Sequence, residues 1–314
     1  MNENPLVSVV VITYNSSSTI LDTLDSIASQ QYNNKELIIS DDCSKDETVK
    51  TANLWLEKHK DLFVNSKIIT TRKNSGTVKN LNRGIKASKG EWIKILAGDD
   101  CLNKNAIESY VQYVNNHQDC KMCISHVELF SNDGVVEQKT LNEYDLFFNY
   151  SNVPYSKQWR NIKGSLTFVG PTYFFSRELF NEVLGFDEKY VLLEEWPFCY
   201  NVLKRGYHIH AINEKLVRYR ISNNSVSHER NNGLRGYQIY KDTFNFFFKV
   251  RLLELLKDGR FICSWNEIIK YVKEGMLQEH RGSSLWMLLS KSLSIVYPKW
   301  YKNHIRSICN KIKQ

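Results

Sequence analysis

The sequence predicts an α/β fold, in which a mostly parallel sheet flanked by helices is followed by a mixed α+β region and a C-terminal helical segment. Strand and helix patterns alternate through the first hundred residues, which is typical of parallel strands joined by right-handed helical crossovers. The alternation stops after Asp100, and from about residue 231 the pattern is helical. The chain has 314 residues, 42% of them hydrophobic, and can bury a full core. We therefore divide it into residues 1–102, 103–230 and 231–314.

Two strand and helix units open the chain. Residues 7–13 form a continuous β-branched run, as expected for a strand buried on both faces, and residues 20–28 place their apolar side chains on one helical stripe. A second strand is predicted over residues 36–40. Ser44 and Glu47 then have capping-box spacing, which predicts that Ser44 caps the second helix.

Two further units complete the alternating region, and a mixed pattern follows it. We expect strands over residues 67–71 and 92–96, with a helix over residues 78–85 between them. Residues 141–170 are expected to form a mobile loop. The remaining expectations are helices at 106–114, 177–183 and 194–205, strands at 122–130, 207–212 and 216–219, and a hairpin turn at 132–134.

The net charge of +8 is concentrated at the C-terminus. Residues 281–314 contain seven Lys and Arg residues, no Asp or Glu, and interleaved Trp and Tyr. This composition suits an anionic membrane surface, or alternatively a solvated helical face with buried aromatic rings. No nucleic-acid-binding module accompanies it, so we expect no nucleic-acid partner. The helices after residue 231 are expected to pack on the sheet domain or on a second copy of the chain, as a homo-oligomer.

Location and redox state are read from the absence of targeting signals. No basic region precedes the short apolar run near the N-terminus, and charged residues interrupt every long apolar stretch. We therefore expect a cytoplasmic protein, at most peripheral on the inner face of the cell membrane. The seven cysteines are expected to stay reduced, with Cys120 and Cys123 in the core rather than on zinc.

Polar segments follow all four predicted strands, at residues 13–15, 41–44, 72–76 and 98–100. The carboxyl ends of parallel strands share one edge, where such sheets bind ligands, so we expect these segments to meet. Two of them carry paired carboxylates, and no dinucleotide-binding glycine motif or P-loop is present. Carboxylates repel phosphate. A phosphate-bearing ligand at this edge therefore requires a divalent cation, Mg²⁺ or Mn²⁺, between them.

A second acidic pair, Glu194 and Glu195, stands at the start of a predicted helix. Acidic residues there can simply complement the helix dipole. However, the apolar run at residues 190–193 and the following Trp196 would partly desolvate a carboxylate and raise its pKa toward that of a working base. The pair is therefore a candidate general base.

The order and spacing of these motifs resemble a known family. Over about residues 6–222 the chain is similar to inverting glycosyltransferases of family 2 with the GT-A fold, of the bacterial surface-polysaccharide type. The motifs that carry the resemblance are Thr13-Tyr14-Asn15, residues 36–44, Asn74-Ser75-Gly76, Asn82-Arg83-Gly84, Leu96-Ala97-Gly98-Asp99-Asp100, Gly185-Phe186-Asp187, Glu194-Glu195-Trp196 and Tyr219-Arg220.

The resemblance implies transfer of a sugar from a nucleotide sugar, in particular a UDP-sugar, to a hydroxyl of a saccharide, free or lipid-linked. Residues 1–102 would bind the donor, and residues 103–230 would bind the acceptor and carry the base. Asp99 would bind the metal, with Asp100 on the donor beside it, and Glu195, or alternatively Glu194, would be the base. The donor would be lined by Thr13, Tyr14, Asn15, Asp41, Asn74, Gly76, Asn82 and Arg83, with Asp41 on the nucleobase.

Three positions depart from the family pattern. Ala97 replaces the first Asp of the D-x-D motif, which puts a ribose contact in doubt unless Asp100 compensates. Cys43 stands where Gly is common, and Ser222 where His is common. Two other functions remain open from sequence alone. One is a nucleotidyltransferase, although a Gly-rich triphosphate loop is missing, and the other is a non-catalytic nucleotide-binding scaffold.

Overall fold

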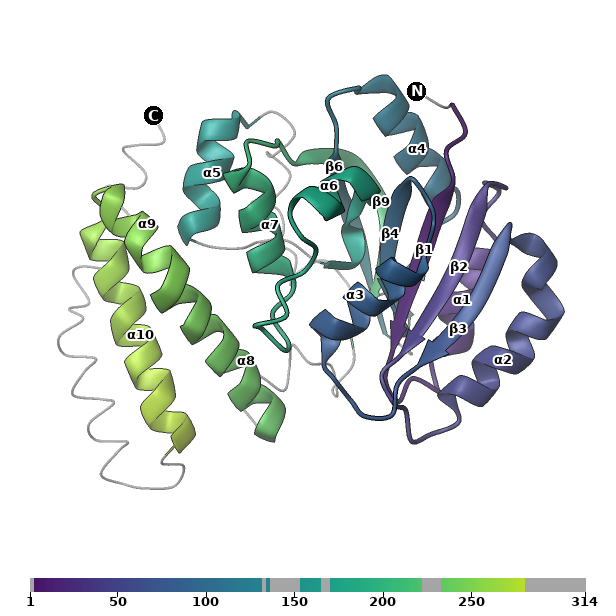
Figure 1. Cartoon of the computed structure of the whole chain (residues 1–314), viewed down its shortest axis with the longest axis horizontal. Coiled ribbons are helices and arrows are strands. Elements are labelled where there is room, and N and C mark those ends of the chain that lie inside the picture. The colour runs from purple at the N-terminus through teal and green to yellow at the C-terminus, as the bar shows by residue number, and fades with distance from the viewer. Residues whose placement is uncertain (1–2, 132–133, 136–152, 165–169, 222–232, 280–314) are drawn as a thin grey trace. The chain divides into compact units, whose positions relative to one another are not determined.

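The computed structural model describes residues 3–131, 134–135, 153–164, 170–221 and 233–279, within which nine strands form a single sheet (Figure 1). The strand order is β3-β2-β1-β4-β8-β6-β9-β5, and β7 pairs with β6. By contacts the chain divides into two units, Met1–His228, which contains the sheet, and Glu229–Gln314, which is helical where described.

The four predicted parallel strands are present and end level with one another. They are β1 (Val7–Thr13), β2 (Lys35–Asp41), β3 (Asn65–Thr70) and β4 (Trp92–Ala97). The register pairs Thr13 with Asp41, Asp41 with Thr70, and Ile12 with Ala97. The polar segments that follow these strands therefore begin at the same edge of the sheet.

Helices cover both faces of this half of the sheet. Successive residues of a strand point to opposite faces, and β1, β2 and β4 carry buried apolar side chains on both, so each face needs a covering layer. Val7, Val9 and Val11 join one core with α1 (Ile20–Ala28), α2 (Thr48–His59) and α4 (Ala106–Asn116). The helix α3 (Thr77–Ala87) packs on β1 and β2. The short 3₁₀ helix η1 (Lys60–Leu62) follows α2.

The mixed region extends the sheet beyond β4. Its strands are β5 (Cys101–Leu102), β6 (Met122–Ser131), β7 (Gly134–Val135), β8 (Phe174–Ser176) and β9 (His210–Arg220). Its helices are α5 (Tyr155–Gly164), the 3₁₀ turn η4 (Gly170–Thr172), α6 (Arg177–Glu182) and α7 (Glu195–Lys204). The strand β8 runs antiparallel to β4, whereas β6 and β9 run parallel to each other.

Two expectations for this region need correction. Residues 207–212 and 216–219 were predicted as separate strands, but β9 is one strand that passes register shifts opposite His126. Part of the predicted loop at 141–170 is helical, since α5 occupies residues 155–164. Residues 136–152 and 165–169 lie outside the described residues. The predicted hairpin is confirmed by the antiparallel pairing of β6 and β7.

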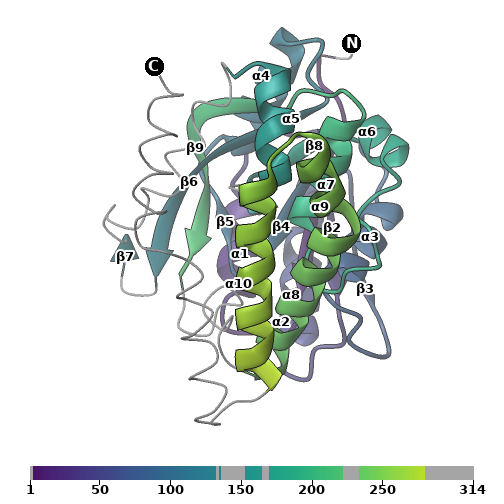
Figure 2. The same cartoon turned by 90° about the vertical axis from the view of Figure 1, so that its left-hand side faces the viewer.

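The second unit consists of helices in its described part. They are α8 (Gly233–Phe246), the π-helix η6 (Phe247–Arg251), α9 (Leu252–Lys257) and α10 (Phe261–Glu279), and α10 contacts both α8 and α9 (Figure 2). Phe247, Leu255 and Tyr271 form its core. The basic stretch at 281–314 lies outside the described residues. No described helix combines the length and apolar character needed to cross a bilayer.

Candidate active site

At the candidate site the end of β1 is hydrogen-bonded to Asp41, the last residue of β2. Thr13 Oγ1 donates a hydrogen bond to Asp41 Oδ2 at 2.9 Å, and the Ser44 backbone N–H donates to Asp41 Oδ1 at 2.9 Å. The Ser44 hydroxyl also donates to Asp41. Ser44 therefore does not cap α2 as predicted, and the N-cap residue of that helix is Glu47, which makes no side-chain capping bond. Asp41 is almost fully buried.

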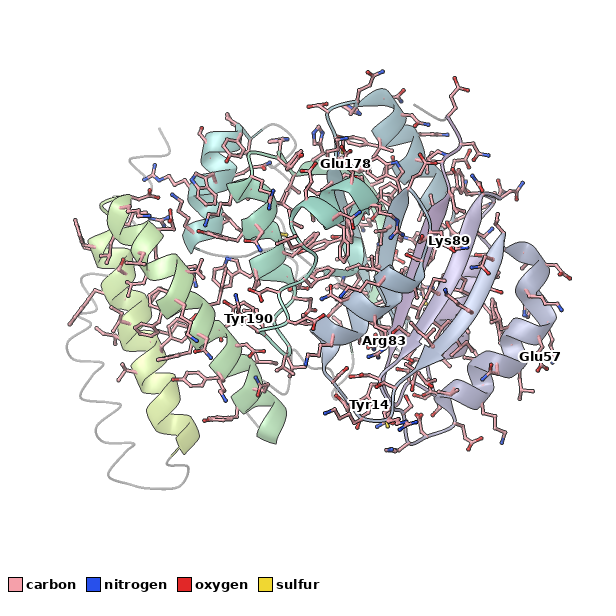
Figure 3. The ribbon with its side chains drawn as sticks, in the orientation of Figure 1. Tyr14, Glu57, Arg83, Lys89, Glu178 and Tyr190 are labelled. Atoms are coloured by element: carbon pink, nitrogen blue, oxygen red, sulfur yellow. The ribbon has the colours of Figure 1, made fainter. Side chains whose placement is uncertain are left out.

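Tyr14 and Asn15 form the turn after β1. Asn15 adopts a left-handed conformation with φ of 53°, which Asn tolerates better than most residues. Its N–H donates to Ser44 Oγ at 2.8 Å, and its side-chain oxygen accepts from the Lys45 N–H at 2.8 Å. Tyr14 is half-buried and lies with Arg83 at this edge of the sheet (Figure 3).

Asp42 holds the segment after β3 in place through hydrogen bonds to its side chain. Its buried carboxylate accepts hydrogen bonds from the backbone N–H groups of Ser75 and Gly76, each at 2.8 Å, and from Ser75 Oγ at 2.6 Å. Arg83 Nη2 adds an ion pair at 3.1 Å. The guanidinium of Arg83 also donates to the Asn80 side chain at 2.7 Å. Arg83, which was predicted to bind the nucleotide-sugar donor, is thus held by Asp42 and Asn80 at the edge of the sheet.

Position 76 requires a glycine, because of its backbone conformation and because neighbouring atoms leave no room for a side chain. Its φ is +89°, and a Cβ at this position would lie 2.5 Å from Val191 Cγ1 and 2.7 Å from the Val191 carbonyl oxygen. Exposed Asn74 accepts the Gly76 N–H at 3.1 Å. The segment at 72–76 therefore meets the segment that leads into α7.

Asn82 is not at the rim of the sheet. It is 3% exposed, its oxygen accepts from the Phe186 N–H at 3.0 Å, and its Nδ2 donates to the Phe186 carbonyl at 2.8 Å and to Glu188 Oε1 at 3.0 Å. This amide ties α3 to the Gly185-Phe186-Asp187 motif. A contact with a donor would require these bonds to break.

Asp99 and Asp100 follow β4 beside the end of β1, where the Gly98 N–H donates to the Ile12 carbonyl at 2.9 Å. Burial raises the pKa of Asp99. Burial and the charge of Asp99 raise the pKa of Asp100 well above its usual range. The backbone N–H of Arg220 donates to Asp100 Oδ1 at 2.9 Å, and its Nε donates to the Asp99 carbonyl at 2.8 Å.

The acidic pair fits a divalent cation that is shared with a phosphate ligand. Within the described residues, no other residue donates a hydrogen bond to the Asp99 carboxylate, which is the kind of hard oxygen donor that Mg²⁺ and Mn²⁺ prefer. The described parts of the chain contain no group of three His, Cys, Asp or Glu side chains able to hold a metal. The protein would therefore supply one or two carboxylates, and phosphates and water the remaining ligands, as is usual for Mg²⁺.

Glu195 is the first residue of α7, with Glu194 at its N-cap. The Gly170 N–H donates to Glu195 Oε1 at 2.6 Å, and a Cβ at position 170 would lie 2.8 Å from that oxygen. The Trp196 indole N–H donates to the Ile162 carbonyl at 2.7 Å and anchors the helix start to α5. Burial raises the pKa of Tyr173 well above its usual range, and the neighbouring Cys199 and the charges of the two glutamates act in the same direction.

The structure therefore gathers most, but not all, of the predicted residues. Thr13, Asn15 and Asp41 are bonded through one network at the edge of the sheet, and Gly98 places Asp99 next to it. Sequence reasoning missed the role of Asp42, although its carboxylate stands beside Asp41. Glu195 is held on a different segment, by the η4 turn.

Comparison with known proteins identifies relatives along most of the chain. The sequence model of the family described as "Glycosyl transferase family 2" matches residues 8–184. TuaG of Bacillus subtilis, provisionally named a teichuronic acid biosynthesis glycosyltransferase, is 25% identical over 257 residues, covering 82% of this chain and 92% of its own. The amylovoran biosynthesis glycosyltransferase AmsB of Erwinia amylovora is 26% identical over 220 residues, 68% of each chain.

Solved structures confirm the predicted GT-A-type fold. TarS of S. aureus in complex with UDP-GlcNAc matches with a TM-score of 0.57 and 18% identity, over 86% of this chain and 80% of TarS. The mannosyltransferase PcManGT of Pyrobaculum calidifontis, in complex with GDP-Man and Mn²⁺, matches with a TM-score of 0.61 and 19% identity, over 96% of this chain and 83% of its own.

Proposed function

The chain belongs to glycosyl transferase family 2, and from this we propose that it moves a sugar from a nucleotide sugar, in particular a UDP-sugar, to a hydroxyl of a saccharide acceptor in cell-surface polysaccharide synthesis. The desolvated Asp99–Asp100 pair beside the strand end that carries Thr13 and Asp41 is the observation that carries this proposal. The names of the relatives TuaG and AmsB support the polysaccharide context.

A divalent cation, Mn²⁺ or Mg²⁺, is proposed to be held by Asp99 together with the donor diphosphate. When bound, such a cation stabilises the negative charge that develops on a departing diphosphate. Asp100 is proposed to act on the donor side, and its bond to Arg220 fixes its orientation. A Mn²⁺ complex of the similar mannosyltransferase supports a cation in this fold.

Glu195 is proposed to be the general base of an inverting single displacement. Its carboxylate accepts the proton of the acceptor hydroxyl, and the acceptor oxygen forms a bond to the anomeric carbon. The bond between that carbon and the diphosphate oxygen breaks on the opposite face, and the nucleoside diphosphate leaves. A positioned base of this kind contributes roughly 10²- to 10⁴-fold in rate. Glu194 is the alternative base.

The stereochemistry of the product tests this mechanism. NMR of the glycoside formed from an α-linked UDP-sugar should show the β anomer, and a retained configuration would rule out single displacement. Glu195→Gln should lower kcat by roughly 10²- to 10⁴-fold with little change in UDP affinity. Full turnover by the Glu194→Gln, Glu195→Gln double variant would remove both candidates for the base.

The donor and the cation are tested together by the released product and by the metal requirement. Release of UDP rather than pyrophosphate would separate sugar transfer from nucleotidyl transfer, and slow donor hydrolysis without acceptor would exclude a non-catalytic scaffold. Asp99→Asn should cost roughly 10²- to 10³-fold in kcat. Unchanged rates in excess chelator would contradict the cation. Since TarS binds UDP-GlcNAc and PcManGT binds GDP-Man, thermal shifts with both nucleotide classes test the UDP preference.

The helical unit is proposed to bring the enzyme to an anionic membrane, where a lipid-linked acceptor would lie. Phe261 and Trp265 on α10 are 64% and 55% exposed, and Lys257 at the end of α9 is exposed beside them in sequence. Aromatic and basic side chains together suit a lipid headgroup region. Sedimentation with anionic but not neutral vesicles is expected, and it should weaken in Phe261→Ala, Trp265→Ala and on deletion of residues 281–314.

A further inference from the structure

Lys94 is a fully buried lysine in the sheet. It lies on β4 with 0% exposure, and its ammonium group donates to the carbonyl of Pro171, to that of Ile95 at 3.3 Å and to that of Tyr173 at 3.4 Å. Burial lowers the pKa of Lys94 to about 7. An apolar side chain of similar volume would avoid this desolvation cost, so the lysine is explained by what its ammonium group interacts with, namely these carbonyl groups and the charge of the buried Asp100 carboxylate.

Two of the three carbonyl groups that Lys94 binds, those of Pro171 and Tyr173, belong to the η4 turn and to the residue after it, and the third is that of Ile95 on β4. Tyr110 supports the same turn, since its hydroxyl donates to the Thr172 carbonyl at 2.9 Å and its ring lies 5.2 Å from the Lys94 ammonium. The turn is closed by the Tyr173 N–H, which donates to the Gly170 carbonyl at 3.0 Å. Two buried side chains thus fix three successive carbonyl groups of η4 and its end.

The other side of this turn holds the proposed base, because the Gly170 N–H donates to Glu195 Oε1 at 2.6 Å. We propose that Lys94 is a positioning residue, which fixes η4 so that the Gly170 N–H holds the Glu195 carboxylate in one orientation. The inference rests on the proposed role of Glu195. It assigns Lys94 a function at the active site although its side chain points to backbone carbonyls and has no contact with solvent.

Lys94→Met tests the proposal, since it removes the ammonium group and keeps the length of the side chain. We expect kcat to fall by roughly 10- to 100-fold, because small displacements of a catalytic group have effects of this size. KM for the donor should stay within about twofold. The acidic limb of the pH–rate profile should move to higher pH, because the Gly170 N–H stabilises the ionised carboxylate.

Lys35 provides a matched control for the loss of a buried lysine. It is 2% exposed, lies on β2, and its ammonium donates to the carbonyls of Gln30 at 2.9 Å and Tyr32 at 2.8 Å. Lys35→Met therefore removes the same kind of bond away from η4. Its kcat and pH profile should match those of the wild type, and an equal loss in both variants would overturn the proposal.

A double-mutant cycle distinguishes positioning through the turn from a general structural effect. Gly170→Ala places a methyl group against Glu195 Oε1 and should lower kcat by itself. If Lys94 acts through Gly170, the Lys94→Met, Gly170→Ala double variant should lose little more than the worse single variant. Multiplicative losses would contradict the proposal. Should Lys94→Met fail to fold, Tyr110→Phe removes the bond to the Thr172 carbonyl together with the bond to Ser125 Oγ on β6, and a smaller loss in the same direction is expected, whereas Ser125→Ala, which removes only the second bond, should leave kcat unchanged.

The failure of this inference and the failure of the proposed base give different results. Full activity of Glu195→Gln would remove the proposed base and with it the role of Lys94. A severe loss in Glu195→Gln together with wild-type kcat and pH profile in both Lys94→Met and Tyr110→Phe would overturn the positioning role alone.

Discussion

Replacing Asp42 by Asn should destabilise the sheet edge more than any single hydrogen bond suggests. The buried carboxylate accepts four bonds, from two backbone N–H groups, a hydroxyl and the Arg83 guanidinium. Hydrogen bonds to a charged group contribute about 1.5–3 kcal/mol each, and Asn keeps only one accepting oxygen. Breaking a buried ion pair on one side costs about 3–5 kcal/mol. We therefore expect Asp42→Asn to lower the free energy of unfolding by about 3–5 kcal/mol.

Urea unfolding at pH 7 measures the loss, and Ser75→Ala is the matched control. That variant removes the hydroxyl bond to Asp42 and the longer bond from Arg83 Nη1 to the same hydroxyl, and it leaves both backbone N–H bonds to Asp42 in place, so about 1.5 kcal/mol is expected. The reasoning would be refuted if Asp42→Asn lost no more than Ser75→Ala, since the carboxylate would then not clamp the segment at 72–76.

Three further predictions concern stability. Gly76→Ala should cost at least about 2 kcal/mol from left-handed strain and the contact with Val191, whereas Gly206→Ala, at φ of +92° with open space, should cost less, and equal losses in urea unfolding would contradict the contact. Asn82→Ala leaves both backbone groups of Phe186 without partners and should cost about 2–3 kcal/mol in urea unfolding, so a loss below about 0.5 kcal/mol would contradict the tie. Burial raises the pKa of Asp46, but hydrogen bonds from Thr48 and Ser17 outweigh it and lower the pKa to about 2. This stabilisation is present above the unfolded pKa of about 3.9 and is lost as pH falls through 2. Asp46→Asn should therefore lower the free energy of unfolding by about 1 kcal/mol at pH 5, a small value because the group is exposed, and by less at pH 3. A loss that stays constant between pH 5 and pH 3 would refute the assignment.

The alternating half of the fold could be predicted because its signals are local. The β-branched run of β1 and the apolar stripe of α1 follow from side-chain periodicity, and parallel topology then places the polar segments at one edge. The helix α5 gives a weak signal, since few of its side chains are buried. The strand β9 was divided in two by the polar residues at 213–215, which a register shift accommodates in the structure.

The roles of individual polar residues were harder to predict than their location. Asp42 and Asp99 are the same residue type in two similar polar segments. The carboxylate of Asp42 accepts bonds from the backbone N–H groups of Ser75 and Gly76, which lie 33 and 34 residues later, whereas no other residue in the described parts of the chain donates to the Asp99 carboxylate. Asn82 carries a family motif, yet its amide is bonded to Phe186, about a hundred residues later. Sequence patterns reveal residue types, whereas these roles depend on which distant backbone groups approach.

Calorimetric titration of UDP with and without Mn²⁺, on the wild type, Asp99→Asn and Glu195→Gln, tests most directly whether the acidic end of β4 holds a donor through a cation. We expect Mn²⁺ to strengthen UDP binding at least about tenfold in the wild type and in Glu195→Gln, and to have little effect in Asp99→Asn. Equal enhancement by Mn²⁺ in all three proteins, or none in the wild type, would contradict the assignment of Asp99.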